Sequence, residues 1–415
     1  MRLSSMTMIL ALAAAPAMAA TKAPPKDPKI WAAAEAARAE QLKLLEAVVN
    51  VDSGTGDADG GRKVASLLIP RLKALGMTVE SVKAEADGLP ENTVATLAGT
   101  GKGRILMIGH IDTVFGPGTV ARRPYRVDGD HARGPGVSDE KGGVVEGVYA
   151  LQLLHDLGFK DFKQITFLIE TSEERGSPGT RALIARLLKD ADVELNLEPA
   201  DAPDAVTVWR KGSTIFEIDV KGRAAHAGVA PQEGRNAAEE VIHQLRAIQP
   251  FPKTGDGMTV NLTLLSAGSR NNIIPEDASA TLNVRVRKRE DAEKVAQALA
   301  ESAKTTEIPD TKVTIKREVS FPPLENNPAT DALAERAKAI YAGVGLTLGT
   351  AGNGGASESA LAADAKVPAL DGLGPVGGGF HSDAEYLDLK TVTPRLYLLT
   401  RLIQDLGRNP PAPMK

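Results

Sequence analysis

The feature of this sequence that most constrains its fold is an alternation of strand and helix patterns that is interrupted once. Apolar residues recur with helical spacing over residues 31–51, 62–75, 143–157 and 179–188. Short β-rich runs bounded by Gly, Pro or Asn cover residues 77–83, 92–98, 104–110, 164–170 and 193–197. This alternation predicts an α/β fold with a mostly parallel sheet flanked by helices.

The interruption lies between residues 211 and 318. Strand patterns there cover 214–220, 258–265, 278–287 and 311–316, and helical patterns cover 236–248 and 290–303. The resulting βαββαβ order is typical of a ferredoxin-like α+β unit. After residue 322 the alternation resumes, with a helix at 331–343, a Gly-rich loop at 352–355, a strand at 367–373 and a helix at 392–406. We therefore predict one α/β domain built from residues 21–210 and 321–415, with a second domain inserted at 211–320.

Composition narrows the chemistry that the chain can perform. Its 415 residues leave room for two domains. The formal net charge of −4 lacks the positive excess that nucleic-acid binding requires, so nucleic acid is not an expected partner. The chain has no cysteine, which excludes disulfides, iron–sulfur clusters, Cys–zinc sites and a catalytic thiol. Any metal must therefore be bound by His, Asp and Glu.

The first twenty residues read as a signal peptide. They contain an early Arg2, an apolar stretch from residue 6 to 15, and Ala17-Met18-Ala19 at a small-x-small cleavage position. The apolar run is too short to span a bilayer, and a Pro- and Lys-rich segment follows it. The alternative is a buried N-terminal helix. We expect removal of residues 1–20 to leave a periplasmic or secreted protein that does not bind membranes.

Histidine and carboxylate side chains follow several of the predicted strands. His110 and Asp112 end the run ILMIGHIDT, at the edge of an open α/β sheet where ligands bind. The pair can place an imidazole on a metal with a carboxylate behind it. A lone His at a strand end is also a common hydrogen-bonded structural residue.

Further acidic residues lie in similar positions. Asp139 lies in the Gly-rich run GPGVSDEKGG, where it could bridge two metal ions or act only as an acidic helix cap. The buried strand FLIE runs into Glu173 and Glu174, of which one would bind an ion and the other would take a proton from water. Glu198 ends another apolar strand, and His381 lies in a Gly-rich turn. Jointly these nitrogen and oxygen donors suit two divalent ions such as zinc, cobalt or manganese.

The order of the motifs resembles a known family. HIDTV, GPGVSDEKGG, ETSEERGS, NLEP, GRAAHAG, NNIIP, NVRVR and GGGFHSDAEY are similar to motifs of the co-catalytic zinc metallopeptidases that include aminoacylases, dipeptidases and glutamate carboxypeptidases. The resemblance covers nearly the whole mature chain and is strongest to the periplasmic glutamate carboxypeptidases that cleave folates. It implies a zinc-peptidase domain with an inserted lid domain.

The resemblance also implies a role for each matching residue. It implies two zinc ions per subunit, with cobalt or manganese as substitutes. The implied ligands are His110 and Glu198 for one ion and Glu174 and His381 for the other. Asp139 is the implied bridge between the two ions. Glu173 matches the general base and Asp112 the carboxylate behind His110. The family usually has Asp or Asn after the bridging residue, where this chain has Glu140.

Other matches lie in the lid and in the Gly-rich loop. His226 matches a histidine that polarises the scissile carbonyl, often from the partner subunit, which implies a homodimer through the lid. Asn272 and Arg285 match residues that contact the substrate's carboxylate end. Gly354, Gly355 and Ser357 occupy a loop that wraps this carboxylate, although the family pattern Gly-Gly-Thr-Asp reads Gly-Gly-Ala-Ser-Glu here.

These matches predict a metal-dependent exopeptidase or amidohydrolase. We expect it to release a C-terminal amino acid from a small peptide or N-acyl amino acid through a water held between two zinc ions. Glutamate is one candidate, but DAPDAVTV and EVSFPPLE lack the basic residues with which the folate-cleaving relatives hold its side chain. The alternatives are a deacylase or dipeptidase with a different pocket and a periplasmic metal- or ligand-binding protein without turnover. Glu173 argues against the last, and the absence of a Gly-x-Ser-x-Gly motif argues against a serine hydrolase.

Overall fold

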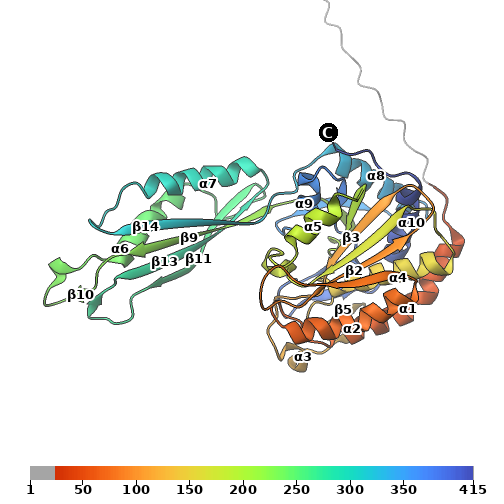
Figure 1. Ribbon diagram of the computed structural model, residues 1–415, viewed down its shortest axis with the longest axis horizontal. Helices are drawn as coiled ribbons and strands as arrows, with labels where there is room; N and C mark the ends of the chain where they lie inside the picture. The colour runs from red at the N-terminus through yellow and green to blue at the C-terminus, as the bar shows by residue number, and fades with distance from the viewer. Residues whose placement is uncertain (1–23, 415) are drawn as a thin grey trace, which may run out of the picture.

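The structure, a computed structural model, describes residues 24–414, so the predicted signal peptide at 1–20 lies outside the described residues. Figure 1 shows two bodies joined by a narrow connection, with the segment from β9 to β14 forming the smaller one. Within the described range, no helix combines the length and the apolar character needed to cross a bilayer.

The larger body is built on a six-stranded sheet with the strand order β1-β2-β6-β3-β7-β16. Strands β6, β3, β7 and β16 pair in parallel, whereas β2 pairs antiparallel with both β6 and the edge strand β1. The prediction of a mostly parallel α/β sheet is therefore confirmed. The strands are β1 (Thr78–Val82), β2 (Asn92–Ala98), β3 (Arg104–His110), β6 (Gln164–Glu170), β7 (Val193–Asn196) and β16 (Ala369–Leu370).

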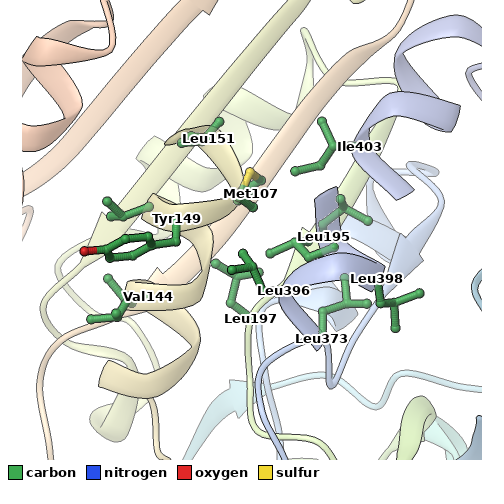
Figure 2. Packing of buried hydrophobic residues seen from close by; sticks show 14 of the residues in the cluster. Met107, Val144, Tyr149, Leu151, Leu195, Leu197, Leu373, Leu396, Leu398 and Ile403 are labelled. Atoms are coloured by element: carbon green, nitrogen blue, oxygen red, sulfur yellow. The ribbon is translucent and has the colours of Figure 1, made fainter. Parts of the chain in front are cut away.

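Helices cover both faces of this sheet because successive side chains of each strand point to opposite sides. Met107 of β3 packs into the larger core, together with Val144 and Leu396 from the helices, as Figure 2 shows. Its neighbours Leu106 and Ile108 pack into a second core on the other face. The helices on the larger core are α1 (Pro28–Val49), α2 (Ala58–Ala74), α4 (Lys141–Asp156), α8 (Pro328–Ala342) and α10 (Val392–Arg408). Those on the second core are α5 (Arg181–Leu188) and α9 (Ser359–Asp364).

Glycine lets α4 begin close to the end of β7. A Cβ atom at Gly143 would lie 1.8 Å from the carbonyl oxygen of Leu197, so no larger residue fits there. This close approach brings the loop before α4, which carries Asp139, next to the chain that follows β7, which carries Glu198.

The smaller body is a four-stranded antiparallel sheet with the order β11-β13-β9-β14, covered on one face by two helices. Its chain order is β9 (Gly212–Lys221), α6 (Ala237–Gln244), β11 (Met258–Ala267), β13 (Asp277–Val286), α7 (Arg289–Ser302) and β14 (Lys312–Phe321). This is the βαββαβ order expected from the sequence, and we call this body the lid. A small pair, β10 (Ala225–His226) and β12 (Ile273–Ile274), forms the tip of the lid farthest from the central sheet (Figure 1).

Several element boundaries differ from the sequence patterns. The strand expected at 367–373 is only the two-residue β16, and the strand expected at 311–316 extends to Phe321. Two small sheets were not predicted, because three-residue strands and a Gly-rich strand carry too few periodic positions. Their strands are β4 (Arg126–Asp128), β5 (His131–Arg133), β17 (Gly377–Gly378) and β18 (Tyr386–Asp388) in one, and β8 (Ala205–Arg210) and β15 (Gly349–Asn353) in the other. A short helix, α3 (Thr119–Arg122), precedes β4.

Candidate active site

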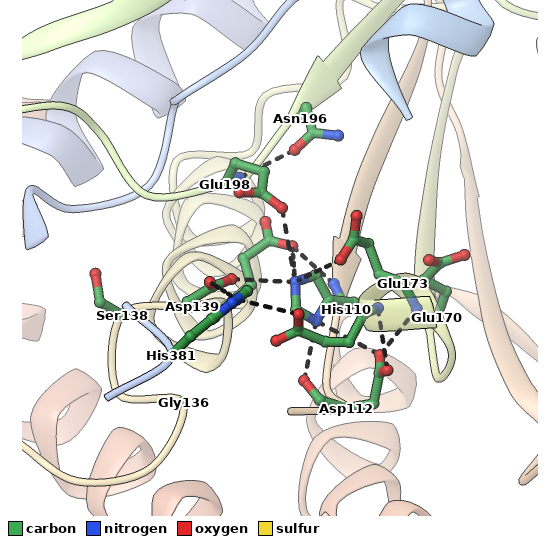
Figure 3. Close-up of polar contacts among 12 residues, drawn as sticks. His110, Asp112, Gly136, Ser138, Asp139, Glu170, Glu173, Asn196, Glu198 and His381 are labelled. Atoms are coloured by element: carbon green, nitrogen blue, oxygen red, sulfur yellow. Dashed lines mark hydrogen bonds and ion pairs between the residues drawn. The ribbon is translucent and has the colours of Figure 1, made fainter. Parts of the chain in front are cut away.

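Side chains from five segments converge at the carboxyl ends of β3, β6 and β7 (Figure 3). His110 is the last residue of β3, Glu173 and Glu174 lie in a 3₁₀ turn after β6, and Glu198 follows β7. Asp139 comes from the loop before α4. His381, in the turn between β17 and β18, reaches the same place. Two groups have donor atoms close enough to share one cation: His110 with Glu173 and Glu198, and His110 with Asp139 and Glu174.

Asp139 lies between the two histidines. Its Oδ1 atom is 3.3 Å from His110 Nε2, and its Oδ2 atom is 3.2 Å from His381 Nε2. On the first side, Glu198 Oε1 is 3.6 Å from His110 Nε2; on the second, Glu174 Oε2 is 3.2 Å from His381 Nε2. The structure thus brings together all five side chains that the sequence nominated as metal ligands, in two halves that share Asp139.

The donor set fits divalent metal ions. Nδ1 of His110 lies 3.0 Å from the backbone oxygen of Asp112, which can only accept, so this nitrogen carries the proton. Nε2 is buried and faces carboxylate oxygens, of which Asp139 Oδ1 at 3.3 Å is the nearest, in a poorly aligned contact. A neutral imidazole nitrogen surrounded by carboxylate oxygens, with its other nitrogen held by a backbone carbonyl, is the arrangement that zinc sites use.

The electrostatics of the cluster favour a cation. Burial raises the pKa of Glu173 well above its usual range, and it raises the pKa of Glu198 to about 7 although Arg210 opposes the shift. Burial opposes a charge on His110, but bonds to the surrounding carboxylates outweigh it and raise its pKa. Hydrogen bonds to Asp139 and Glu174 raise the pKa of His381 to about 10. The crowded carboxylates contribute to these raised pKa values because bound protons reduce their negative charge. A divalent ion would compensate the same charge in place of the protons.

Asp112 ties His110 to the turn that carries the two glutamates. Its carboxylate accepts hydrogen bonds from the backbone N–H groups of Glu173 and Glu174, at 3.1 and 3.3 Å, and from the hydroxyl of Thr55 at 2.6 Å. The sequence placed this carboxylate behind His110. It is 3.5 Å from Nδ1, whereas the shorter contact comes from the backbone oxygen of the same residue.

Two buried acids that support this arrangement were not nominated from the sequence. Glu385 accepts hydrogen bonds from the backbone N–H groups of Gly136, Ser138 and Asp139 and so shapes the loop that presents Asp139. Glu140 accepts from the backbone N–H of His110 at 2.9 Å. The place of Glu385 in GGGFHSDAEY was the available sequence signal, but the three residues that it bonds lie 246 or more positions away.

A cavity of about 770 Å³ opens beside the cluster, between the larger body and the lid. Glu173 and His381 line it together with Arg285 of β13 and the loop residues Gly354 and Gly355. Arg285 is bonded only to the neutral side chain of Asn283, at 3.1 Å, among the described residues. Three of the candidate carboxylate-binding residues, Arg285, Gly354 and Gly355, therefore line the same cavity as the candidate general base.

His226 and Asn272 do not reach this cavity. Both are exposed at the tip of the lid, where the backbone oxygen of Asn272 accepts from Ala227 and Nδ1 of His226 accepts from two neighbouring N–H groups (Figure 1). Ser357 is buried behind the Gly-rich loop and donates its hydroxyl to Asp371. Within one chain, these three residues are not positioned to touch substrate.

Sequence reasoning also missed Arg210. This residue ends β8 and lines the cavity, and its guanidinium group bonds Asp371 and Glu198. The segment DAPDAVTV, which lacks basic residues, ends two residues before Arg210. An arginine at the end of the apolar run AVTVW was the signal that could have found it.

The fold and the site agree with comparisons to known proteins. The family model for peptidase family M20/M25/M40 matches residues 106–405. The chain therefore belongs to this family of metallopeptidases, and it is a metal-dependent exopeptidase or amidohydrolase. It is 35% identical over 385 residues to carboxypeptidase G2 of Pseudomonas sp. (strain RS-16). The aligned region covers 92% of this chain and 93% of that protein.

Solved structures agree on the fold. The aminopeptidase PepT of Bacillus cereus has a TM-score of 0.72 and 22% identity, over 89% of this chain and 99% of that one. The metallo-carboxypeptidase Sso-CP2 of Sulfolobus solfataricus has a TM-score of 0.70 and 16% identity, over 88% and 98%.

Proposed function

We propose that this chain is a carboxypeptidase-type hydrolase that uses two divalent ions, zinc in the first instance, and releases a C-terminal amino acid from a peptide or N-acyl amino acid. His110 and Glu198 would hold one ion, Glu174 and His381 the other, and Asp139 would bridge them. The observation that carries the proposal is the position of Asp139, with one oxygen facing each histidine. Metal analysis combined with a hydrolysis assay on the purified chain tests it: two zinc ions per chain and amide hydrolysis are expected.

The residues around the cluster supply the remaining chemistry. When bound, zinc polarises the scissile carbonyl and makes water more acidic. Glu173 takes the proton from the attacking water and passes it to the leaving nitrogen. Burial raises the pKa of Glu173, which favours the protonated form that must return the proton to the leaving nitrogen. Asp112 keeps Glu173 in place through the backbone bond described above.

The free carboxylate of the substrate is assigned to Arg285 and to the backbone N–H groups of Gly354 and Gly355. Arg285→Met is expected to raise KM for free-acid substrates roughly 10- to 100-fold, because a charge-assisted hydrogen bond is lost. The same substitution should hardly change the already poor hydrolysis of the amidated substrate. Steady-state kinetics on matched acid and amide substrates measure both effects. Equal rates of the wild type on acid and amide would contradict the assignment.

The cavity lining bears on which amino-acid side chain the enzyme accepts at the C-terminus of its substrate. Ile215 and Phe321 line the cavity on the lid side and favour an apolar side chain, whereas Arg175 at the cavity wall favours an acidic one such as glutamate. A panel of N-acyl-glutamate, N-acyl-leucine and dipeptides, compared by kcat/KM, separates a glutamate carboxypeptidase from a deacylase or dipeptidase.

We further propose a homodimer in which each lid completes the other chain's site. His226 lies in β10 and Asn272 directly precedes β12, at the tip of the lid, and neither residue lines the cavity of its own chain. Strand β11 is an edge strand with Leu262, Leu264 and Leu265 exposed, and an exposed apolar edge is a ready surface for pairing. These observations support a partner lid at this edge.

Mixing two inactive variants tests this arrangement. His226→Ala and Glu173→Gln should each be nearly inactive alone. Refolded or co-expressed together, they should regain about a quarter of the wild-type rate, because half of randomly mixed dimers hold one intact site. If His226 acted in its own chain, mixing would restore nothing. Sedimentation of the wild type should give a dimer.

A periplasmic or secreted location remains part of the proposal. It is supported by the apolar stretch and small-x-small site within residues 1–20. Fractionation of cells that express the full chain, with a variant lacking residues 1–20 as control, tests it.

A further inference from the structure

Arg210 is a buried cation that joins two parts of the candidate active site. Its Nε and Nη2 atoms donate to the two carboxylate oxygens of Asp371, both at 2.7 Å, in a bidentate pair. Nη2 also donates to Glu198 Oε2 at 3.2 Å. The Arg210 side chain is 5% exposed and that of Asp371 is fully buried, so solvent does not screen these contacts.

The contact with Glu198 fixes how that carboxylate is presented. Arg210 holds Oε2, while Oε1 points toward Nε2 of His110 at 3.6 Å. Because Asp371 already balances the charge of Arg210, the arginine can orient Glu198 without neutralising it. One oxygen of Glu198 is therefore held by Arg210, and the other is left for a cation.

The same arginine reaches the Gly-rich loop. The parallel pairing of β15 with β8 places Asn353 beside Arg210, and the two side chains meet at 3.4 Å. The same Asn353 oxygen accepts the backbone N–H of Gly355 at 2.9 Å. Ser357, on the far side of the loop, donates to Asp371. Arg210 and Asp371 are thus connected at one end to Glu198 and at the other to both sides of the loop.

We propose that Arg210, held by Asp371, is a positioning residue that orients Glu198 for its cation and sets the shape of the carboxylate-binding loop. The inference rests on the proposed function, in which Glu198 binds a cation and the loop binds the substrate's carboxylate. Neither residue touches the reacting atoms. Their effect is exerted through Glu198 and through Asn353.

Asp371→Asn is the decisive variant. Without the charge of Asp371, Arg210 pairs with Glu198 alone and competes with the cation. We expect the zinc-loaded variant to release one of its ions to a chromophoric chelator with an affinity roughly 10- to 100-fold below that of the wild type, as for other supports of metal ligands. KM should rise as well, because the loop loses its anchor. Arg210→Lys, which keeps the charge but not the two-pronged geometry, should show a smaller change in the same direction.

Two comparison variants separate positioning from general stability. Asn353→Ala removes only the loop connection, so it should raise KM and leave zinc retention unchanged. Asp204→Asn disrupts a second arginine pair, in which Arg395 Nε donates to Asp204 at 2.8 Å and neither residue lines the cavity. It should lower the melting temperature without changing zinc affinity.

The outcomes distinguish this inference from the proposed function. The inference is overturned if Asp371→Asn, or Arg210→Lys should the former not fold, retains zinc as tightly as the wild type. A wild-type chain that binds no zinc and hydrolyses no amide would instead contradict the proposed function itself.

Discussion

Replacing Glu173 by Gln is expected to lower kcat by about 10²–10⁴-fold while the bound zinc remains at the wild-type level. Glu173 lines the cavity, is 8% exposed and has its Oε2 atom 3.8 Å from Nε2 of His110. A glutamine has nearly the same shape but cannot take up a proton. Since Glu173 is not assigned as a ligand of either ion, its loss should affect turnover rather than metal content. Steady-state kinetics with metal analysis of the same sample measure both.

A matched control is Glu170→Gln. Glu170, the last residue of β6, is also a buried carboxyl group, but it accepts a hydrogen bond from Ser177 and does not line the cavity. Burial, followed by the charge of Glu358, raises the pKa of Glu170 well above its usual range, which favours the uncharged acid that a glutamine amide resembles. The kcat of Glu170→Gln should therefore stay near that of the wild type. Near-normal turnover of Glu173→Gln at full zinc content would remove Glu173 from the role of general base.

The ligand cluster was predictable from sequence because of strand geometry. His110, Glu174 and Glu198 each follow an apolar run, and parallel strands deliver such residues to one edge of the sheet. The Gly-rich segments around Asp139 and His381 indicated loops that approach that edge closely. The central sheet and the inserted lid followed from the same periodic patterns.

Contacts between distant side chains were not predictable in this way. Arg210 and Asp371 are 161 residues apart, and neither lies in a motif that names its partner. The exact extent of β16 depends on pairing with only two residues of β7, which no local pattern encodes. The position of His226 relative to the cavity depends on how the lid is oriented, a property of tertiary structure that its own sequence does not reveal.

Removing the metal is expected to make the fold progressively less stable as the pH rises from about 5 to 9, and adding zinc is expected to abolish this dependence. Burial raises the pKa of Glu198 to about 7, and it also raises the pKa values of Glu173 and Glu174. A carboxyl group whose pKa is higher in the folded state stabilises the fold below its unfolded pKa of 4.5, and this contribution is lost as the pH rises through the folded value. In the metal-free chain, ionisation therefore leaves several negative charges together.

The histidines act in the same direction. Hydrogen bonds to Asp139 and Glu174 raise the pKa of His381 to about 10, so its contribution is complete below 6.5 and is lost as the pH approaches 10. Asp139 has the opposite shift. Burial raises its pKa, but the hydrogen bonds from His110 and His381 dominate and hold it below the usual range, so its contribution is lost only in strong acid, outside this window.

Thermal unfolding between pH 5 and 9, with zinc or with a chelator, measures the effect. Zinc at a thousand times its Kd should add about 4 kcal/mol, and more of this gain should appear as a higher melting temperature at alkaline pH, where protons no longer occupy the site. Glu198→Gln provides the control, since it removes one titrating carboxyl and one ligand together and should weaken both the pH dependence and the response to zinc. Two results would mean that these carboxylates do not gather around a cation. One is a melting temperature of the metal-free chain that rises with pH; the other is a melting temperature that the chelator does not change.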